Sequence, residues 1–235
     1  MKSYRSPAPS WAACVMSCAF ALCLVSALAS AAPKELKRAE RATRVLREVL
    51  NTPDARIPAE LLSQAYAIAV IPEVVKAGLI IGGRHGRGVV SVRSRDGSWS
   101  NPSFIMLTGG SIGWQAGVQA ADVILVFRTE RGVDNLVNGK FTLGADASIA
   151  AGPVGREVNA GTDEEFKAEI LSYSRTRGLF AGIALDGSAL SIDFEANQDV
   201  YGSKVTPRML FENRVRNAPV EIVRFRDQLE EQTAK

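Results

Sequence analysis

The segment that most resembles a catalytic motif is Gly109-Gly110-Ser111-Ile112-Gly113, which has the form G-x-S-x-G. In hydrolases this form places a nucleophilic serine at a sharp turn between a strand and a helix, and the catalytic histidine comes last in the chain. Here the residues after Gly113 alternate and include another glycine, which indicates a strand, and the only histidine, His85, precedes the serine. A hydrolase with Ser111 as its nucleophile is therefore only a remote alternative.

Acidic residues and cysteines offer no better catalytic or metal site. Asp163, Glu164 and Glu165 are adjacent and follow Thr162, which predicts the capped start of a short helix rather than a calcium loop. The sequence contains no Walker loop and no dinucleotide-binding fingerprint between a strand and a helix. We therefore predict a protein that is not an enzyme and that needs no metal and no cofactor.

The remaining chemical candidates are cations beside glycine-rich segments, where arginine and exposed backbone amides can bind an anion. One group surrounds the segment GGRHGRG, and the other lies in SYSRTRGLFAG. The anion-binding candidates are Lys76, Arg84, Arg87, Arg175 and Arg177. For each of them, a solvated or internally paired cation is the alternative, and Asp122, at the start of an apolar stretch, is a candidate partner.

The first 31 residues have the organisation of a secretory signal peptide. Lys2 and Arg5 precede an uncharged apolar run over 11–28, and Ala29-Ser30-Ala31 provides small residues for cleavage after Ala31. We expect export to the periplasm or cell envelope of a bacterium by a cleaved signal peptide. An uncleaved membrane anchor and lipoprotein anchoring at Cys18 are the alternatives.

Removal of this segment changes the bulk chemistry of the chain. All three cysteines precede residue 31, so the mature chain has no disulfide and no thiol chemistry. Two cations and no acidic residue are lost, so the formal net charge falls from +3 to +1. This balance argues against nucleic acid as a partner, and any electrostatic function has to come from local clusters.

Residues 33–51 are expected to form an amphipathic basic helix, because small and apolar residues recur every three or four positions. The expected apolar stripe comprises Leu36, Ala39, Thr43, Leu46 and Leu50. A basic face that could lie on an anionic membrane comprises Arg38, Arg41, Arg44 and Arg47. Because the helix lacks aromatic anchors, packing of the stripe on the domain is the favoured interpretation.

The rest of the mature chain alternates between apolar strands and turn residues. Strands are expected at 66–71, 88–93, 99–107, 122–127, 145–151, 170–176, 179–185 and 190–194, and helices at 58–62, 129–137 and 219–232. Turn residues at 95–98 and at 186–188 predict hairpins. We therefore expect an α+β fold in which β-rich antiparallel sheets are packed or rolled as a sandwich or barrel, with helices at both ends of the mature chain.

Four segments of this sequence, taken in order, resemble the SYLF domain over residues 60–202. They are AYAIAVIPEVVKAGLIIGGRHGRGVVSVR, GGSIGWQAGVQAADVILVF, LGADASIAAGPVGR and ILSYSRTRGLFAGIALDGSAL. The last is similar to the core motif of that family at Ser172, Tyr173, Gly178, Leu179, Phe180 and Gly182. The expected organisation is a signal peptide (1–31), an amphipathic helix with its linker (32–57), the SYLF-like domain (58–202) and a C-terminal helical extension (203–235).

The resemblance implies a non-catalytic domain that binds lipid, with anionic phospholipid or a membrane surface of the cell envelope as its partner. The cations named above are the candidate ligands of a lipid head group. Eukaryotic members of the family are implied to bind phosphoinositide membranes, and some bind actin. Because this chain is expected to be exported and has no evident actin-binding extension, actin is not expected to be its partner. A structural role or an envelope protein partner is the alternative function.

Overall fold

The computed structural model describes residues 33–51, 57–78, 81–112, 117–139, 141–154, 168–176 and 179–233. Several predictions lie outside these ranges, namely the signal peptide with cleavage after Ala31, anchoring at Cys18, the short helix at 162–165, and the positions of Arg177 and Gly178. Residues Lys34–Lys235 form one compact unit. The amphipathic helix and the C-terminal helical extension therefore belong to the same unit as the β-rich part.

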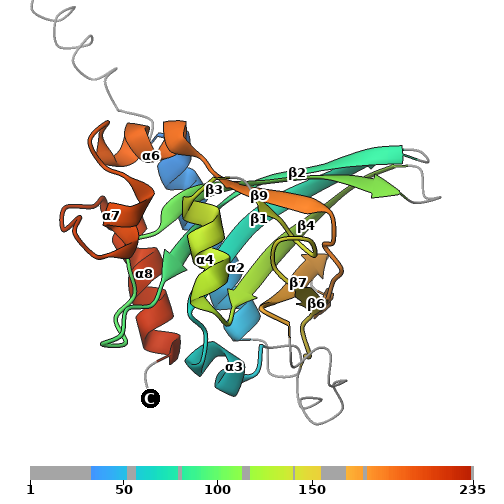
Figure 1. Ribbon diagram of the computed structural model, residues 1–235, viewed down its shortest axis with the longest axis horizontal. Coiled ribbons are helices and arrows are strands. Elements are labelled where there is room, and N and C mark those ends of the chain that lie inside the picture. The colour runs from blue at the N-terminus through green and yellow to red at the C-terminus, as the bar shows by residue number, and fades with distance from the viewer. Residues whose placement is uncertain are drawn as a thin grey trace, which may run out of the picture. The chain divides into compact units, whose positions relative to one another are not determined.

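A single curled sheet of nine strands forms the centre of this unit (Figure 1). Its strands run in the order β5-β9-β3-β2-β1-β4-β7-β6, and β8 also pairs with β7. Every pair is antiparallel except β6 with β7. The strands are β1 (Ala67–Gly78), β2 (Ile81–Val92), β3 (Ser103–Ile112), β4 (Gly117–Phe127), β5 (Phe141–Thr142), β6 (Ile149–Ala151), β7 (Ile170–Thr176), β8 (Leu179–Gly182) and β9 (Ser188–Ile192). The predicted α+β class with a rolled β-rich sheet is confirmed.

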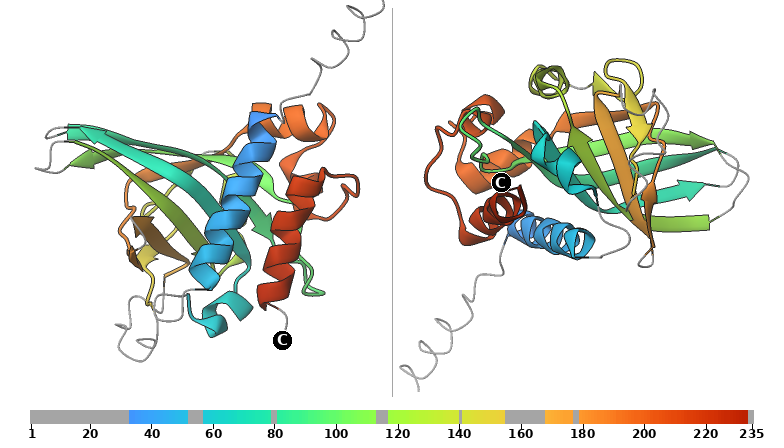
Figure 2. Two further views of the ribbon diagram at one scale, coloured as in Figure 1. Left: turned by 180° about the vertical axis from the view of Figure 1, so that it is seen from behind. Right: turned by 90° about the horizontal axis from the view of Figure 1, so that it is seen from below.

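Helices lie on both sides of the sheet. They are α2 (Lys34–Leu50), α3 (Ala59–Ser63), α4 (Glu130–Val137), α6 (Phe194–Tyr201), α7 (Pro207–Phe211) and α8 (Val220–Thr233). The first and last of them, α2 and α8, lie side by side across one face of the sheet, and α4 lies at the other (Figures 1 and 2). None of the described helices is both long enough and apolar enough to cross a membrane.

Alternation along the strands builds a separate apolar core on each face of the sheet. On the face that α2 and α8 cover, here called the helix face, Ile68 and Val70 of β1 pack in one cluster with Leu46 and Phe225 of the helices. On the opposite face, here called the inner face, Ile71 belongs to a second cluster that also contains residues of α4 and β9. Because successive strand residues point to opposite faces, each side chain of the four central strands can be assigned to one of the two surfaces.

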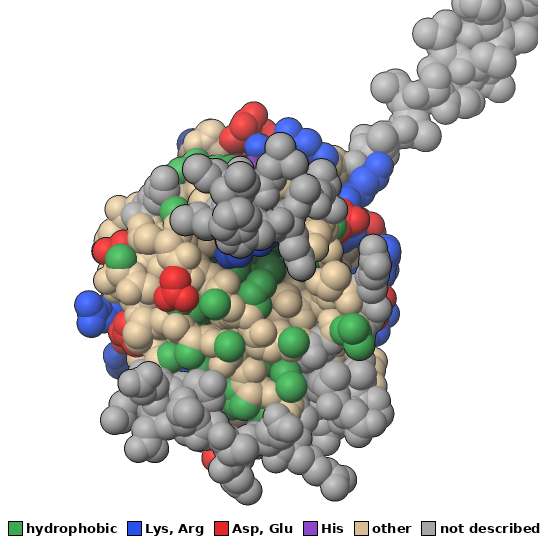
Figure 3. Space-filling view, turned by 90° about the vertical axis from the view of Figure 1, so that its right-hand side faces the viewer, with side chains coloured by type: hydrophobic (Ala, Val, Ile, Leu, Met, Phe, Trp, Pro, Cys, Tyr) green, Lys and Arg blue, Asp and Glu red, His purple; other side chains and the backbone are tan. Residues whose placement is uncertain are grey.

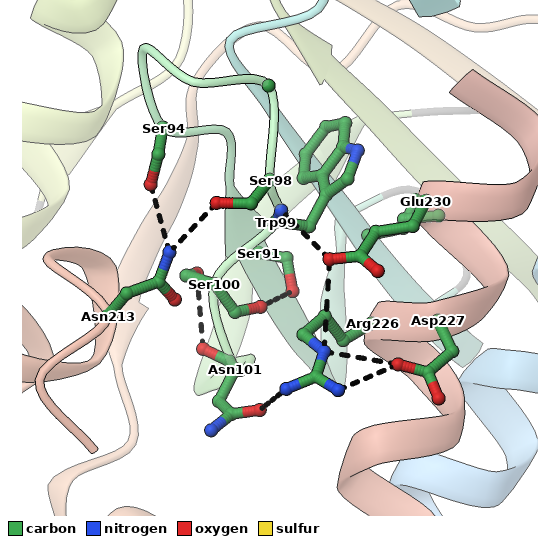
Figure 4. A network of polar contacts seen from close by, with 12 residues as sticks. Ser91, Ser94, Ser98, Trp99, Ser100, Asn101, Asn213, Arg226, Asp227 and Glu230 are labelled. Carbon is green, nitrogen blue, oxygen red and sulfur yellow. Dashed lines mark hydrogen bonds and ion pairs between the residues drawn. The ribbon is translucent and has the colours of Figure 1, made fainter. Parts of the chain in front are cut away.

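The C-terminal helix is fastened to the hairpin between β2 and β3 by polar contacts (Figure 4). The backbone N–H of Trp99 donates to Glu230 across 3.4 Å, and its indole N–H donates to Thr233 across 2.8 Å. Arg226 donates to the side-chain oxygen of Asn101 across 3.4 Å, and the amide of Asn213 donates to the hydroxyl of Ser94 across 2.9 Å. The contacts of Trp99 and Asn101 hold the residues after the predicted hairpin turn against α8, and Asn213, which lies between α7 and α8, holds the turn itself.

Several expectations about the strands were wrong, among them the bounds of the strands predicted at 88–93 and 145–151, which are β2 and β6. Strand β1 does not end at Pro72 but continues to Gly78 through a bulge, at which Glu73 adopts a left-handed φ of 52°. The predicted strands at 179–185 and 190–194 do not form a hairpin, because β8 pairs with β7 and β9 pairs with β3. The second of them ends at Ile192, since Asp193 caps α6 by accepting a hydrogen bond from the backbone N–H of Ala196.

Candidate functional site

Strands β3, β2, β1 and β4 continue past the helices as a four-stranded extension (Figure 2). In this extension, Lys76 of β1 lies directly opposite Arg84 of β2. Strand residues that are an even number of positions apart point to the same face, and Val74 and Val90 belong to the inner-face core. Lys76 follows Val74 by two positions and Arg84 precedes Val90 by six, so both cations belong to the inner face. The register completes a row across five strands, which we call the cation row: Gln119, Lys76, Arg84, Gly109 and Ser188.

The two cations of the row have no acidic partner among the described residues. Neither Lys76 nor Arg84 makes an ion pair there, and the other members of the row are neutral. One Nη of Arg84 donates to the hydroxyl oxygen of Ser188 across 3.1 Å. Both cations are half-buried, and burial lowers the pKa of the Arg84 guanidinium. Since like charges directly opposite one another destabilise a sheet, this pair has an energetic cost that an anion would remove.

The strand positions on the two sides of the cation row differ: they are mostly apolar toward the core, and they include two glycines toward the strand ends. The next row toward the core contains Ala121, Val74, Leu107 and Leu190. The row toward the strand ends contains Gly78 and Gly82, which have no side chains to cover the cations. Figure 3 shows this end of the molecule, where hydrophobic side chains are spread over the middle of the face and most Lys and Arg side chains lie along its borders. The arrangement suits a ligand with an anionic and an apolar part.

Arg87 does not belong to this site. It lies opposite Met106 and shares its side of β2 with Val89, which packs in the helix-face core. Its side chain is exposed. The structure therefore brings Lys76 and Arg84 together and places Arg87 on the other face of the same strand.

Arg175 also lies on the helix face, where two carboxylates hold it. It donates to Asp122 through Nη2 at 2.7 Å and Nε at 3.1 Å, and it forms an ion pair with Glu48 of α2. Burial lowers the pKa of Arg175, but the hydrogen bonds to Asp122 and Glu48 outweigh it, so the net shift is upward. The expectation that Asp122 pairs with one of the candidate cations is confirmed, and this guanidinium is committed to the contact between α2 and the sheet.

The expected basic face of residues 33–51 needs one correction. Arg38 is only 5% exposed, so it is not part of a membrane-facing surface. It forms an ion pair with Asp193 at 3.0 Å, and its guanidinium lies 5.4 Å from the centre of the Phe104 ring. Arg41, Arg44 and Arg47 are exposed, with Arg41 paired to Glu73 at 3.1 Å and Arg47 donating to Gln228. The predicted apolar stripe packs on the sheet, and Ala39 and Leu46 are fully buried.

The residues of the family-like motif serve the packing of β6, β7 and β8. The Ser172 hydroxyl lies 3.0 Å from the carbonyl oxygen of Ala150 and 2.5 Å from that of Ile183, so it joins three segments. Tyr173 is fully buried, and burial raises the pKa of its hydroxyl. Gly182 pairs with Tyr173 across β7 and β8. Leu179, by contrast, is 79% exposed, and Phe180 lies in β8.

The geometry around Ser111 differs from that of a nucleophile elbow. Ser111 lies within strand β3, and the next described element is another strand, β4. His85 lies within β2, opposite Thr108 rather than opposite the serine. No group of three or more metal-ligating side chains occurs among the described residues.

A groove of about 820 Å³ lies at the other end of the sheet, beside the C-terminal ends of α3 and α8. Arg93 is its central side chain, and it donates to the carbonyl oxygens of Ser63, Gly97 and Thr233. Arg93 therefore serves as a cap for the two helix ends. Gln119, Gly109 and Ser188 of the cation row were not predicted from the sequence, because only the strand register brings them beside Lys76 and Arg84.

Comparison with known proteins identifies relatives over most of the chain. "LAS seventeen-binding protein 3" of Saccharomyces cerevisiae is 36% identical over 176 residues, which are 74% of this chain and 38% of the relative. "Protein YSC84" of the same yeast is 35% identical over 80% of this chain and 42% of its own length. Human "SH3 domain-containing YSC84-like protein 1" is 35% identical over 72% of this chain and 51% of its own length. The chain thus matches about two fifths to one half of each of these relatives.

A family model described as "Ysc84: Las17-binding protein actin regulator" matches residues 108–232, which are more than half of the chain. The matched region contains the whole of the SYSRTRGLFAG motif, strands β4 to β9, and helix α8 up to its penultimate residue. The family model and the similarity to the yeast and human relatives agree with the resemblance found in the sequence. The chain therefore belongs to the Ysc84 family of SYLF-domain proteins.

Proposed function

We propose that this protein is a non-catalytic binding protein that attaches to anionic phospholipid at the cell envelope through the inner face of its sheet extension. The observation that carries the proposal is the Lys76–Arg84 pair, two facing cations with no acidic partner in the described part of the chain. An anionic head group would neutralise both charges and accept their N–H groups. The apolar row next to the cations would accommodate the beginning of the hydrocarbon region.

Co-flotation with vesicles tests this function. We would use residues 34–235, because they form a compact unit with both apolar cores and lack the apolar run at 11–28, which could attach to vesicles by itself. We expect binding to vesicles in which about one third of the lipid is anionic, and little binding to neutral vesicles. Binding should weaken when the salt concentration is raised from about 0.1 to 0.5 M, because salt screens exposed charges. Absence of binding to both vesicle types would refute the proposal, and binding insensitive to salt would refute its electrostatic basis.

The envelope location is supported by the sequence of residues 1–31, which has the order of a charged, an apolar and a small-residue region. Cell fractionation followed by mass spectrometry of the intact protein tests it. We expect the protein in the envelope or periplasmic fraction, with an N-terminus at Ala32. A cytoplasmic protein that retains Met1 would contradict this part of the proposal.

A protein partner is the second candidate function. It is supported by the family description, which names Las17 binding and actin regulation, although the chain matches only about half or less of the relatives' length. Co-sedimentation of residues 34–235 with actin filaments separates it from the lipid function. Binding to filaments without binding to anionic vesicles would favour the second candidate, and the reverse result would favour the first.

A further inference from the structure

We propose that the Lys76–Arg84 pair is a subsite for a phosphate monoester and that it prefers a monoester head group to a phosphodiester. This inference rests on the proposed function and names the class of head group that the site selects. Its starting point is the register of β1 and β2, which places one lysine directly opposite one arginine on the inner face.

Charge supports a monoester. A phosphate monoester carries a charge of about −1.5 to −2 at pH 7, since its second pKa is about 6. A phosphodiester carries a single negative charge. Two facing cations without a carboxylate partner in the described part of the chain are neutralised by a dianion, whereas a monoanion leaves one positive charge half-buried. The half-burial of Lys76 and Arg84 strengthens this difference, because water screens a half-buried charge less than an exposed one.

The donors also fit a monoester. Arg84 uses one Nη to reach the hydroxyl of Ser188, and its other N–H groups make no hydrogen bond to the described residues. A guanidinium has five N–H donors and an ammonium has three, so the pair can serve several acceptors at once. A monoester offers three terminal oxygen atoms to such donors. The Ser188 contact fixes the direction of the Arg84 side chain, which makes Ser188 a positioning residue.

Gly109 completes the arrangement by allowing Ser188 to approach. A Cβ atom at position 109 would lie 2.8 Å from the hydroxyl oxygen of Ser188 and 3.0 Å from its Cα atom. Any larger residue would therefore displace the group that holds Arg84. Toward the strand ends, the neighbouring positions of β1 and β2 are Gly78 and Gly82, which place no side chain beside the cations.

The experiment compares vesicles containing phosphatidate, a monoester, with vesicles containing phosphatidylglycerol, a diester, at pH 7.5 and at matched surface charge. We expect residues 34–235 to bind the phosphatidate vesicles about tenfold more tightly, the effect of roughly one additional charge-assisted hydrogen bond. Lys76→Gln and Arg84→Gln should each abolish this preference, and Ser188→Ala should reduce it, because Arg84 then loses the contact that fixes its direction. Arg87→Gln, which removes the same charge from the other face of β2, should retain it.

A titration with soluble glycerol 3-phosphate, followed by NMR, separates a lipid head group from a free phosphate ester. Equal binding of the wild-type protein to both vesicle types would overturn the monoester inference and leave the proposed lipid function standing. Binding of glycerol 3-phosphate without binding to any vesicle would support the subsite but overturn the lipid function, and binding of neither would overturn both. If Arg84→Gln fails to fold, the Lys76→Gln variant tests the inference. The side chain of Lys76 is half-buried and makes no hydrogen bond to the described residues, so its replacement by glutamine should not disturb the fold.

Discussion

At the scale of single residues, the cations of this protein differ in the partners that surround them. Arg38 and Arg175 are held by carboxylates, and Arg93 is held by backbone carbonyl groups at two helix ends. Lys76 and Arg84 face one another with no acidic partner among the residues that the structure describes. The sequence alone offered Arg38, Arg175, Lys76 and Arg84 as similar basic residues. Only their environment separates structural cations from candidate ligands.

The buried ion pair of Arg38 gives the first prediction. Arg38→Ala should lower the free energy of unfolding by about 3–5 kcal/mol, because it leaves the carboxylate of Asp193 buried without its partner. Arg41→Ala, which removes an exposed pair with Glu73 from the same helix, should cost only about 0–1 kcal/mol. Denaturant unfolding of the two variants measures both values. Equal effects of the two substitutions would show that the buried pair has no special importance.

Gly152 gives a second prediction, based on close packing around the motif tyrosine. A Cβ atom at this position would lie 2.1 Å from the Cζ atom of the fully buried Tyr173 ring. Gly152→Ala should therefore destabilise the protein by at least about 1–3 kcal/mol. At Gly83, a Cβ atom would meet no atom within 4 Å, so Gly83→Ala should leave stability unchanged or raise it by up to about 1 kcal/mol. Thermal unfolding compares the two, and a tolerated Gly152→Ala would contradict this packing.

At the scale of elements, helix α2 is attached to the sheet by both apolar and charged contacts. Its buried stripe packs on β1 and β2, and Glu48 reaches the Arg175–Asp122 pair between β7 and β4. Asp122 also accepts a hydrogen bond from the backbone N–H of Glu73 at the bulge of β1. These contacts connect the helix with three strands, so the motif arginine serves the fold.

This attachment predicts separate effects on stability and on lipid binding. Arg175→Gln should lower the free energy of unfolding by about 1–3 kcal/mol, because it removes hydrogen bonds to two carboxylates. The same substitution should change binding to anionic vesicles by no more than about twofold. Denaturant unfolding and vesicle co-flotation of one preparation provide both numbers. A stable variant that no longer binds vesicles would instead identify Arg175 as a ligand of the head group.

Local patterns predicted most elements but not their pairing. The 3.6-residue period of α2 and the apolar run of 122–127 depend on neighbouring residues, and both appear in the structure. The continuation of β1 through Pro72 depends on a bulge, and the separation of β8 from β9 depends on contacts with β7 and β3. The cation row combines five strands, so a single sequence could indicate Lys76 and Arg84 but not Gln119, Gly109 or Ser188. Long-range register was the missing information.

At the scale of the whole molecule, the helices at both ends of residues 34–235 complete one core. Ile222, Phe225 and Leu229 of α8 are fully buried and belong to the same cluster as Leu46 of α2. Each fully buried apolar side chain of this size contributes about 1.5–3 kcal/mol, which is large beside the roughly 5–15 kcal/mol that stabilises a typical domain. The C-terminal helix is therefore integral to the fold.

Removal of α8 tests this conclusion. A chain that ends at residue 219 should lose cooperative thermal unfolding and bind a dye specific for exposed apolar surface. A chain that ends at residue 233 serves as the control, because it retains the whole of α8, and it should unfold like the full unit. Cooperative unfolding of the shorter chain at an unchanged temperature would show that the helix is a dispensable appendage.

The measurement that tests the account most directly compares two double variants with equal loss of charge. Lys76→Gln/Arg84→Gln neutralises the inner-face pair, and Arg41→Gln/Arg44→Gln neutralises two exposed arginines of α2 on the helix face. In co-flotation with phosphatidate vesicles, we predict at least a tenfold (about 1.4 kcal/mol) loss of affinity for the first variant and a loss of no more than about threefold for the second. The opposite order would show that the membrane meets the basic helix and would contradict the assignment of lipid binding to the inner face.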